Sequence, residues 1–325
     1  MISIDKILNI SSENEFKECY LEVFRFQAIN SPVYSQYLNL LGTKIDEVDD
    51  IEKIPFLPIE LFKSHKVVTA CSADDCELLF TSSGTTGMTP SCHHVFRSEI
   101  YEKSFLKAFE LFYDRVEHCN IYALLPSYLE REGSSLIYMI QHLIEKAADG
   151  GFYLYNHDEL LQKIEDRDRN KKTILFGVSF ALLDMAESYK VDFDDEVIIM
   201  ETGGMKGRRR ELPREELHEL LCSSLGVTSI NSEYGMCECL SQSYSFGSGV
   251  FSSPSWMRIL TRDLHDPFRY TATGVRGGVN IIDLANIYSC SFIQTQDIGT
   301  VKTDGSFTIE GRIDNSDLRG CNLLV

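Results

Sequence analysis

A run of small residues between positions 81 and 87 is suited to bind an anion. It directly follows a short apolar run at 78–80, and its sequence is Thr81-Ser82-Ser83-Gly84-Thr85-Thr86-Gly87. Glycine lets backbone N–H groups approach an anion closely, and hydroxyl groups add further donors. A polyphosphate is the ligand that such a loop suits. The run lacks the Gly-Lys-Ser or Gly-Lys-Thr ending of a Walker A loop, and its composition also fits an ordinary connection between elements.

Four downstream motifs follow in an order that resembles a known superfamily. They are Gly203-Gly204, Tyr234-Gly235-Met236-Cys237-Glu238, Thr295-Gln296-Asp297-Ile298-Gly299 and Gly311-Arg312-Ile313-Asp314. Together with the run at 81–87, they resemble the motifs of the adenylate-forming (ANL) superfamily, which contains acyl-CoA synthetases, luciferases and the adenylation domains of peptide synthetases. Each motif alone is unspecific, but the ordered set is hard to obtain by chance.

This resemblance implies ATP and Mg²⁺ as cofactors and a site residue in each motif. The loop Thr81–Gly87 would hold the phosphates, and the loop that contains Gly203, Gly204 and Met205 would lie against the adenine. Tyr234 and Gly235 would also bind ATP.

Three charged residues receive roles that their chemistry supports. Asp297 is suited to accept hydrogen bonds from a ribose diol, and Arg312 is suited to pair with ribose or phosphate oxygens. Glu238 is suited to a catalytic Mg²⁺ ion that keeps several of its waters. Each of the three also fits an ordinary turn or surface position.

The sequence departs from the superfamily in two places. Thr89-Pro90-Ser91 stands where a lysine usually follows the phosphate loop, and the chain ends at Val325, soon after the last motif. The resemblance therefore predicts the large N-terminal domain of the adenylate-forming fold, with the C-terminal domain and its catalytic lysine lacking.

One branch of the superfamily shares this shape, and several segments resemble it. The LuxE-type acyl-protein synthetases of bacterial bioluminescence operons also lack a full C-terminal domain, and the phenylacetate-CoA-ligase-like enzymes are close to them. The segments that resemble this branch are 54–63, 201–207 and 318–321. The resemblance implies activation of a carboxylic acid, a long-chain fatty acid in that branch, and transfer of the acyl group to a protein cysteine as a thioester. Its partner would be an acyl reductase or an acyl-carrier protein.

Cys321 is the predicted acyl acceptor. It lies four residues before the last residue, and chain ends are often mobile, so its thiol is placed to approach an acyl-adenylate. A thiolate is a good nucleophile towards such an activated acid. Cys237 and Cys239 are rival acceptors, and a small buried hydrophobic role is the other interpretation of Cys321.

Three other functions remain open at this point. An acyl- or aryl-CoA ligase would make a CoA-dependent product. A catalytically degenerate subunit that binds an acyl reductase would bind nucleotide without releasing AMP. A kinase-like phosphotransferase would produce ADP instead of AMP.

The elements around these motifs predict an α/β protein. Helical spacing begins near Ser12, residues 31–70 read as loops and short helices, and apolar runs at 78–80, 121–125, 152–155, 173–178 and 197–200 alternate with helical segments. This alternation predicts a mainly parallel sheet with flanking helices. We expect a helical segment at 1–70, a nucleotide-binding core at 71–240 and a β-rich portion at 241–325. Of the adjacent His93 and His94, at most one is expected to be functional, because neighbouring side chains on a strand point in opposite directions.

Composition limits the remaining choices. The net charge of −18 disfavours nucleic acid and anionic lipid as partners and favours a small-molecule or protein substrate, although solubility alone explains it equally well. The sequence shows no signal peptide and no apolar stretch of spanning length. The ten cysteines are scattered without paired spacing, so the sequence predicts a cytoplasmic protein with free thiols.

Overall fold

The computed structural model describes residues 3–69, 75–82, 89–126, 132–189, 191–193, 196–203 and 212–313. The helices in these ranges are α1 (Ile4–Leu8), α2 (Glu13–Asn30), α3 (Pro32–Leu40), η1 (Ile45–Glu47), η2 (Ile51–Lys53), α4 (Leu61–Ser64), α5 (Ser98–Phe112), η4 (Val116–His118), α6 (Ser135–Lys146), α7 (His157–Glu165), α8 (Ser179–Ser188), α9 (Arg214–Leu225) and η5 (Leu284–Asn286). The strands are β1 (Leu57–Pro58), β2 (Leu78–Thr81), β3 (Cys92–Val95), β4 (Cys119–Leu124), β5 (Asp149–Phe152), β6 (Lys172–Val178), β7 (Val197–Thr202), β8 (Asn231–Tyr234), β9 (Ser243–Ser245), β10 (Val250–Ser252), β11 (Met257–Arg262), β12 (Gly277–Asp283), β13 (Phe292–Val301) and β14 (Phe307–Arg312).

One large sheet runs through the molecule and changes character in its middle. Its strand order is β11-β12-β13-β14-β10-β9-β8-β7-β6-β4-β5, and β1 pairs with β13. The strands from β5 to β8 pair in parallel, whereas those from β8 onward to β11 pair antiparallel. The predicted α/β architecture with a β-rich C-terminal portion is therefore confirmed.

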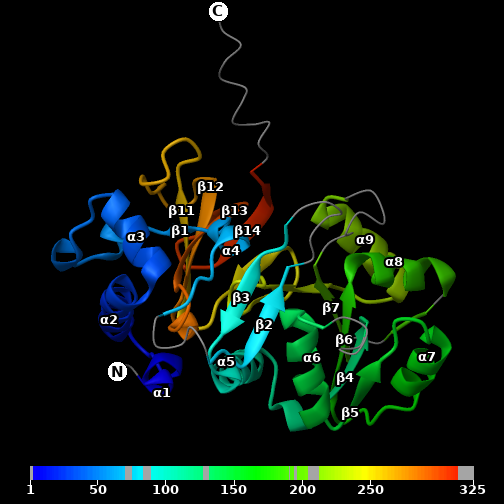
Figure 1. Cartoon of the computed structure of the whole chain (residues 1–325). Coiled ribbons are helices and arrows are strands. Elements are labelled where there is room, and N and C mark those ends of the chain that lie inside the picture. Colours follow the sequence, from blue (N-terminus) through cyan, green and yellow to red (C-terminus); the bar gives the residue numbers. More distant parts are fainter. Residues whose placement is uncertain are drawn as a thin grey trace, which may run out of the picture.

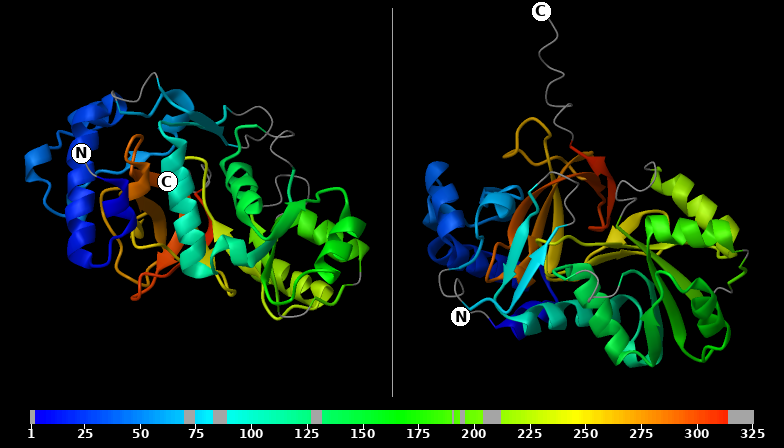
Figure 2. Two further views of the ribbon diagram at one scale, coloured as in Figure 1. Left: turned by 90° about the horizontal axis from the view of Figure 1, so that it is seen from below. Right: turned by 45° about the vertical axis from the view of Figure 1, so that its right-hand side comes forward.

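Helices flank both halves of this sheet. Helices α6 to α9 lie around the parallel half, and α1 to α3 lie on the opposite side of the molecule, beside β11 to β13 (Figures 1 and 2). The inner parallel strands β4, β6 and β7 are almost entirely buried, as helix-covered strands must be. The edge strand β5 is only partly buried. At the other end Phe24 of α2 packs edge-on against Phe292 of β13, with ring centroids 6.0 Å apart.

Local sequence signals set several helix ends. Ser12 caps α2 by accepting a hydrogen bond from the Glu15 backbone N–H, as its spacing predicts. The Glu15 carboxylate reaches back to the N–H of Ser11, one residue earlier than in a regular capping box. Helix α9 ends at Gly226, whose φ of 69° lies in the left-handed region that glycine favours.

Two strands differ from the prediction. Strand β2 does not join the large sheet but forms a separate antiparallel hairpin with β3. The short segment between the two strands suits an antiparallel pair, because a parallel pair needs a longer crossover. Strand β5 begins at Asp149, before the apolar run that predicted it. It contains Gly150, where a side chain would overlap the backbone carbonyl of Ile121 in β4. The close approach of β5 to β4 sets the position of β5, and the pattern of apolar residues in the sequence does not reveal such an approach.

Candidate active site

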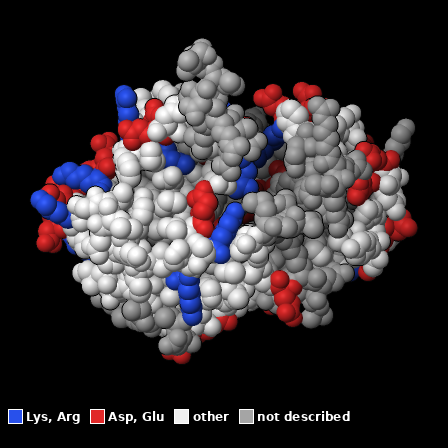
Figure 3. All heavy atoms as spheres, turned by 45° about the horizontal axis from the view of Figure 1, so that its top comes forward, with Lys and Arg blue, Asp and Glu red and all other residues white. Residues whose placement is uncertain are grey.

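A cavity of about 760 Å³ lies where the parallel and antiparallel halves of the sheet meet. Residues from each of the five motifs line it, although they come from distant parts of the chain. They are Thr81, Ser82, Gly203, Tyr234, Gly235, Glu238, Asp297, Gly311 and Arg312. Charged side chains of both signs gather around the middle of this face of the molecule (Figure 3). Lys63 of α4 also lines the cavity, so a cation is present although Thr89-Pro90-Ser91 replaces the expected lysine.

The β2–β3 hairpin holds the start of the predicted phosphate loop. Thr81 pairs with Cys92 across the hairpin, and its N–H donates to the carbonyl of Gly133 over 2.7 Å. The next residue, Ser82, exchanges hydrogen bonds with Ser91: its N–H donates to the Ser91 carbonyl, and its Oγ accepts from the Ser91 N–H at 2.9 Å. The two ends of the segment 83–90 are thereby fixed side by side at the cavity.

Asp297 is held between Tyr234 and Arg312. The Tyr234 hydroxyl donates to Oδ2 of Asp297 over 2.8 Å, and Nε of Arg312 lies 3.3 Å from Oδ1. Strand pairing places Asp297 directly opposite Arg312. Burial raises the pKa of Asp297, while the hydrogen bond from Tyr234 opposes this rise. Thirteen per cent of the Asp297 side chain is exposed, against 71% for Arg312, so the carboxylate is enclosed and the guanidinium that pairs with it lies at the cavity mouth.

The backbone geometry around Asp297 depends on Gly299. A Cβ at this position would overlap the carbonyl oxygen of Thr308, and the β13–β14 register shifts between Ile298 and Gly299. The glycine of the Asp-x-Gly motif therefore permits the close approach of β14 that brings Arg312 to Asp297.

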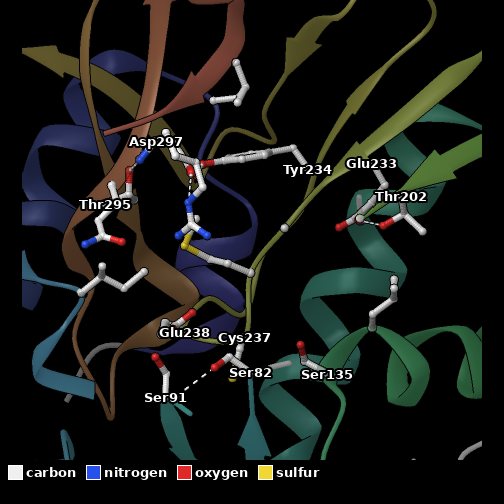
Figure 4. A pocket seen from close by; sticks show the side chains of 18 of the residues that line it. Ser82, Ser91, Ser135, Thr202, Glu233, Tyr234, Cys237, Glu238, Thr295 and Asp297 are labelled. Carbon is white, nitrogen blue, oxygen red and sulfur yellow. Dashed lines mark hydrogen bonds and ion pairs between the residues drawn. The ribbon is translucent and has the colours of Figure 1, made fainter. Parts of the chain in front are cut away.

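Glu238 lies at the base of the cavity. It is 5% exposed and hydrogen-bonded to the hydroxyl of Ser91, near which Figure 4 shows its carboxylate. Burial raises the pKa of Glu238, and the hydrogen bond from Ser91 opposes this rise. A buried carboxylate next to a phosphate loop suits Mg²⁺, which proteins often hold through one carboxylate together with substrate phosphates. Among the described residues, no group of three or more His, Cys, Asp or Glu side chains is arranged to hold a metal by itself.

A buried polar frame fixes the turn that carries Glu238. Nδ1 of His93 lies 2.8 Å from the Cys237 carbonyl, and Nδ2 of Asn286 donates to the Glu238 carbonyl over 2.7 Å. The carboxylate of Asp283 accepts from the Leu240 N–H at 2.7 Å. Burial lowers the pKa of His93 to about 4. His93 is thus a positioning residue of the site, and His94, on the other side of β3, is not part of this frame.

Of the loop predicted to lie against the adenine, the structure describes only the first residue, Gly203. Gly203 follows β7, has a φ of 70° and accepts a hydrogen bond from the Ser179 hydroxyl at 3.2 Å. The left-handed backbone explains why glycine is required there. The other predicted residues Ser83, Gly84, Thr85, Thr86, Gly87, Gly204, Met205 and Cys321 lie outside the described residues.

The two rival thiols are not activated. Burial is the main cause that raises the pKa of Cys237 and the pKa of Cys239, and a thiol with a raised pKa is a poor nucleophile.

Sequence reasoning missed three polar residues that line or flank the cavity. Glu201 and Glu233 are carboxylates inside β7 and β8, and Gln242 comes directly before β9. One sequence signal could have identified the two carboxylates: each lies in an apolar strand immediately before a motif. A charged residue in a buried strand needs a partner or a function.

No family model matches the chain, and a search of curated proteins finds no match. Solved structures do resemble it. ATP-bound MatB from Rhodopseudomonas palustris superposes with a TM-score of 0.56 at 15% identity, over 74% of this chain and 48% of that one. 2-Hydroxyisobutyryl-CoA ligase in complex with 2-HIB-AMP and CoA superposes with a TM-score of 0.65 at 12% identity, over 93% of this chain and 70% of the ligase. O-succinylbenzoate CoA synthetase (MenE) from Bacillus subtilis in complex with AMP superposes with a TM-score of 0.51 at 17% identity, over 75% of this chain and 50% of MenE.

These similarities define the class of fold. The chain has the fold of the large N-terminal domain of adenylate-forming enzymes, as the sequence motifs predict. It spans about half the length of MatB. No helix among the described residues is long and apolar enough to cross a membrane.

Proposed function

We propose that this protein binds ATP with Mg²⁺ and activates a carboxylic acid as an acyl-adenylate. The observation that carries the proposal is the convergence of all five motifs on one cavity, from Thr81 at one edge to Arg312 at the other. The fold supports it, because similar structures bind ATP, AMP or an acyl-AMP.

The residues have complementary tasks in this reaction. Asp297, oriented by Tyr234, accepts hydrogen bonds from the ribose hydroxyls, and Arg312 neutralises developing charge on the phosphates. Glu238 holds Mg²⁺, which supplies charge neutralisation of the triphosphate. A substrate carboxylate oxygen bonds to the α-phosphorus as the bond to pyrophosphate breaks. This gives acyl-AMP and free pyrophosphate.

The acyl acceptor is the finer part of the proposal. We retain transfer to a cysteine thiol, Cys321, as in acyl-protein synthetases: sulfur bonds to the acyl carbon, AMP leaves, and the thiol proton passes to solvent. The raised pKa values of Cys237 and Cys239 support an acceptor elsewhere. Intact mass spectrometry after incubation with ATP and acid tests this step. Equal, hydroxylamine-labile acylation of wild type and Cys321→Ser would eliminate Cys321.

Transfer to CoA is the second candidate, and the resemblance to a CoA ligase captured with CoA favours it. It predicts acyl-CoA in solution and no acyl mass on the protein. Long-chain fatty acid as substrate and an acyl reductase or acyl carrier as partner stay predictions.

The proposal is tested by ATP–pyrophosphate exchange with a panel of acids. Acid-dependent exchange is expected. ADP formation would indicate a phosphotransferase instead, and nucleotide binding with no exchange for any acid would indicate a catalytically inactive binding subunit.

A further inference from the structure

The cavity contains a partly buried carboxylate that the ATP site does not use. Glu233 of β8 lines the cavity, and its Oε2 accepts a hydrogen bond from the Thr202 hydroxyl at 2.6 Å (Figure 4). Its other oxygen, Oε1, has no hydrogen-bond partner among the described residues, and no ion pair joins Glu233 to a described cation. Burial raises the pKa of Glu233 to about 7, since the charged form lacks compensation.

A second unused acceptor lies beside it. Gln242 is 3% exposed and also lines the cavity. Its Nε2 lies 3.4 Å from the Tyr101 hydroxyl, which itself donates to the Ser135 carbonyl at 3.0 Å. Because that hydroxyl's hydrogen is committed, Tyr101 accepts from Gln242, and this fixes the orientation of the amide. The Gln242 Oε1 is then buried without a partner among the described residues.

Glu233 and Gln242 both line the cavity and both approach Gly235. A Cβ at Gly235 would overlap Oε1 of Glu233 and would lie 3.3 Å from Cγ of Gln242. A glycine at this position therefore accommodates the Glu233 carboxylate beside the backbone. A second buried carboxylate, Glu201, lies nearby with its Oε1 bonded to the Ser179 hydroxyl at 2.6 Å, and it disfavours a further negative charge.

This end of the cavity offers acceptors and negative charge, so it fits a ligand group that donates hydrogen bonds and is positive. Two of the described cations that line the cavity are already engaged: Arg312 pairs with Asp297, and Arg214 stacks on Phe251 with 5.0 Å to the ring centroid. The third, Lys63 of α4, forms no ion pair with Glu233. A plain alkyl chain would leave Glu233 and Gln242 buried and unsatisfied, which is costly.

We propose that the acid activated at this site carries an amino group, and that Glu233 and Gln242 accept hydrogen bonds from its ammonium. This inference rests on the proposed function and names its substrate class: an amino-substituted carboxylic acid, with the carboxylate directed to the ATP site and the ammonium to the Glu233–Gln242 pair.

The test compares acids that differ only in the amino group. ATP–pyrophosphate exchange is measured with L-leucine against 4-methylpentanoic acid, L-phenylalanine against 3-phenylpropanoic acid, 6-aminohexanoic acid against hexanoic acid, and with tetradecanoic acid. We expect kcat/KM for the amino-bearing member of at least one pair to exceed its partner by about 10- to 100-fold, the value of a charged hydrogen bond.

Variants assign the preference to this pair. Glu233→Gln should abolish most of the preference. Gln242→Leu, directly before the neighbouring strand β9, should reduce it independently if the first variant folds poorly. Glu216→Gln removes a carboxylate from the exposed face of α9 and should keep the wild-type preference. Equal exchange with amino-free acids, or an unchanged preference in both Glu233→Gln and Gln242→Leu, would overturn the inference and leave the proposed function intact. Absence of exchange with every acid would overturn the proposed function itself.

Discussion

The hydroxyl of Tyr234 donates to Oδ2 of Asp297 over 2.8 Å and joins β8, at the edge of the parallel strands, to β13 in the antiparallel half of the sheet. The Tyr234 ring also packs against Phe251 and Phe307, with centroid distances of 5.8 Å and 5.6 Å. This contact therefore determines where the Asp297 carboxylate points.

Removing the Asp297 carboxylate should weaken nucleotide binding. Asp297→Asn keeps the shape but loses the charged acceptor, and we expect KM for ATP to rise about 10- to 100-fold, as for a charge-assisted hydrogen bond. Tyr234→Phe, which keeps the ring and removes only the orienting hydroxyl, should have a smaller effect in the same direction. A larger effect for Tyr234→Phe than for Asp297→Asn would contradict the assigned order of roles.

Glu238 should determine the metal requirement. Glu238→Gln is expected to lower the exchange rate by about 100-fold or more, since it removes charge stabilisation at the reacting phosphates. The Mg²⁺ concentration that gives half-maximal exchange should rise as well. Glu216→Gln, which removes an exposed carboxylate of α9 that does not line the cavity, is the matched control. A wild-type rate and metal dependence in Glu238→Gln would show that the metal ligand lies elsewhere.

The buried frame behind Glu238 should affect catalysis without touching substrate. His93→Leu removes the His93 contacts of the Cys237 carbonyl and of Oδ1 of Asn286, so we expect a loss of about 1–3 kcal/mol in the free energy of unfolding. Exchange should fall through kcat, with an altered Mg²⁺ dependence. His94→Leu should cost less, because Nδ1 of His94 is buried without a partner in the described structure. Thermal unfolding and exchange kinetics of both variants decide this point, and equal losses would argue against the frame.

Much of the fold was predictable from sequence, for identifiable reasons. Hydrophobic periodicity located β4, β6 and β7, and the signals at Ser12 and Gly226 located helix ends. Periodicity failed at β5, where Gly150 allows close strand approach, and at β2, which pairs with β3 in a separate hairpin. The domain boundaries at residues 70 and 240 remain predictions.

The site was predictable where a motif carries the chemistry and not where topology does. Tyr234, Glu238 and Asp297 follow from their motifs. The pairing of β8 with β9 brings Glu233 near Gln242, and no local pattern contains that information. The frame of His93 and Asn286 was likewise hidden, since the two lie 193 positions apart.

Glu233 should make stability depend on pH. Burial raises its pKa to about 7 from an ordinary value of 4.5. The folded state therefore binds more protons than the unfolded state between these values, and the contribution of Glu233 to stability decreases as pH rises from about 4.5 to about 7. Over this range, wild type should lose about 2–4 kcal/mol relative to Glu233→Gln. Urea unfolding at a series of pH values measures the difference, and a pH-independent difference would show that Glu233 is not a buried, unpaired carboxylate.

The central claim is that this cavity forms an acyl-adenylate, and ATP–pyrophosphate exchange tests it most directly. Purified protein is incubated with ATP, Mg²⁺, labelled pyrophosphate and each acid of the panel, with Asp297→Asn and Glu238→Gln in parallel. We predict label in ATP that depends on one class of acid and falls sharply in both variants. Nucleotide binding without exchange for any acid, or exchange that persists unchanged in both variants, would contradict the account.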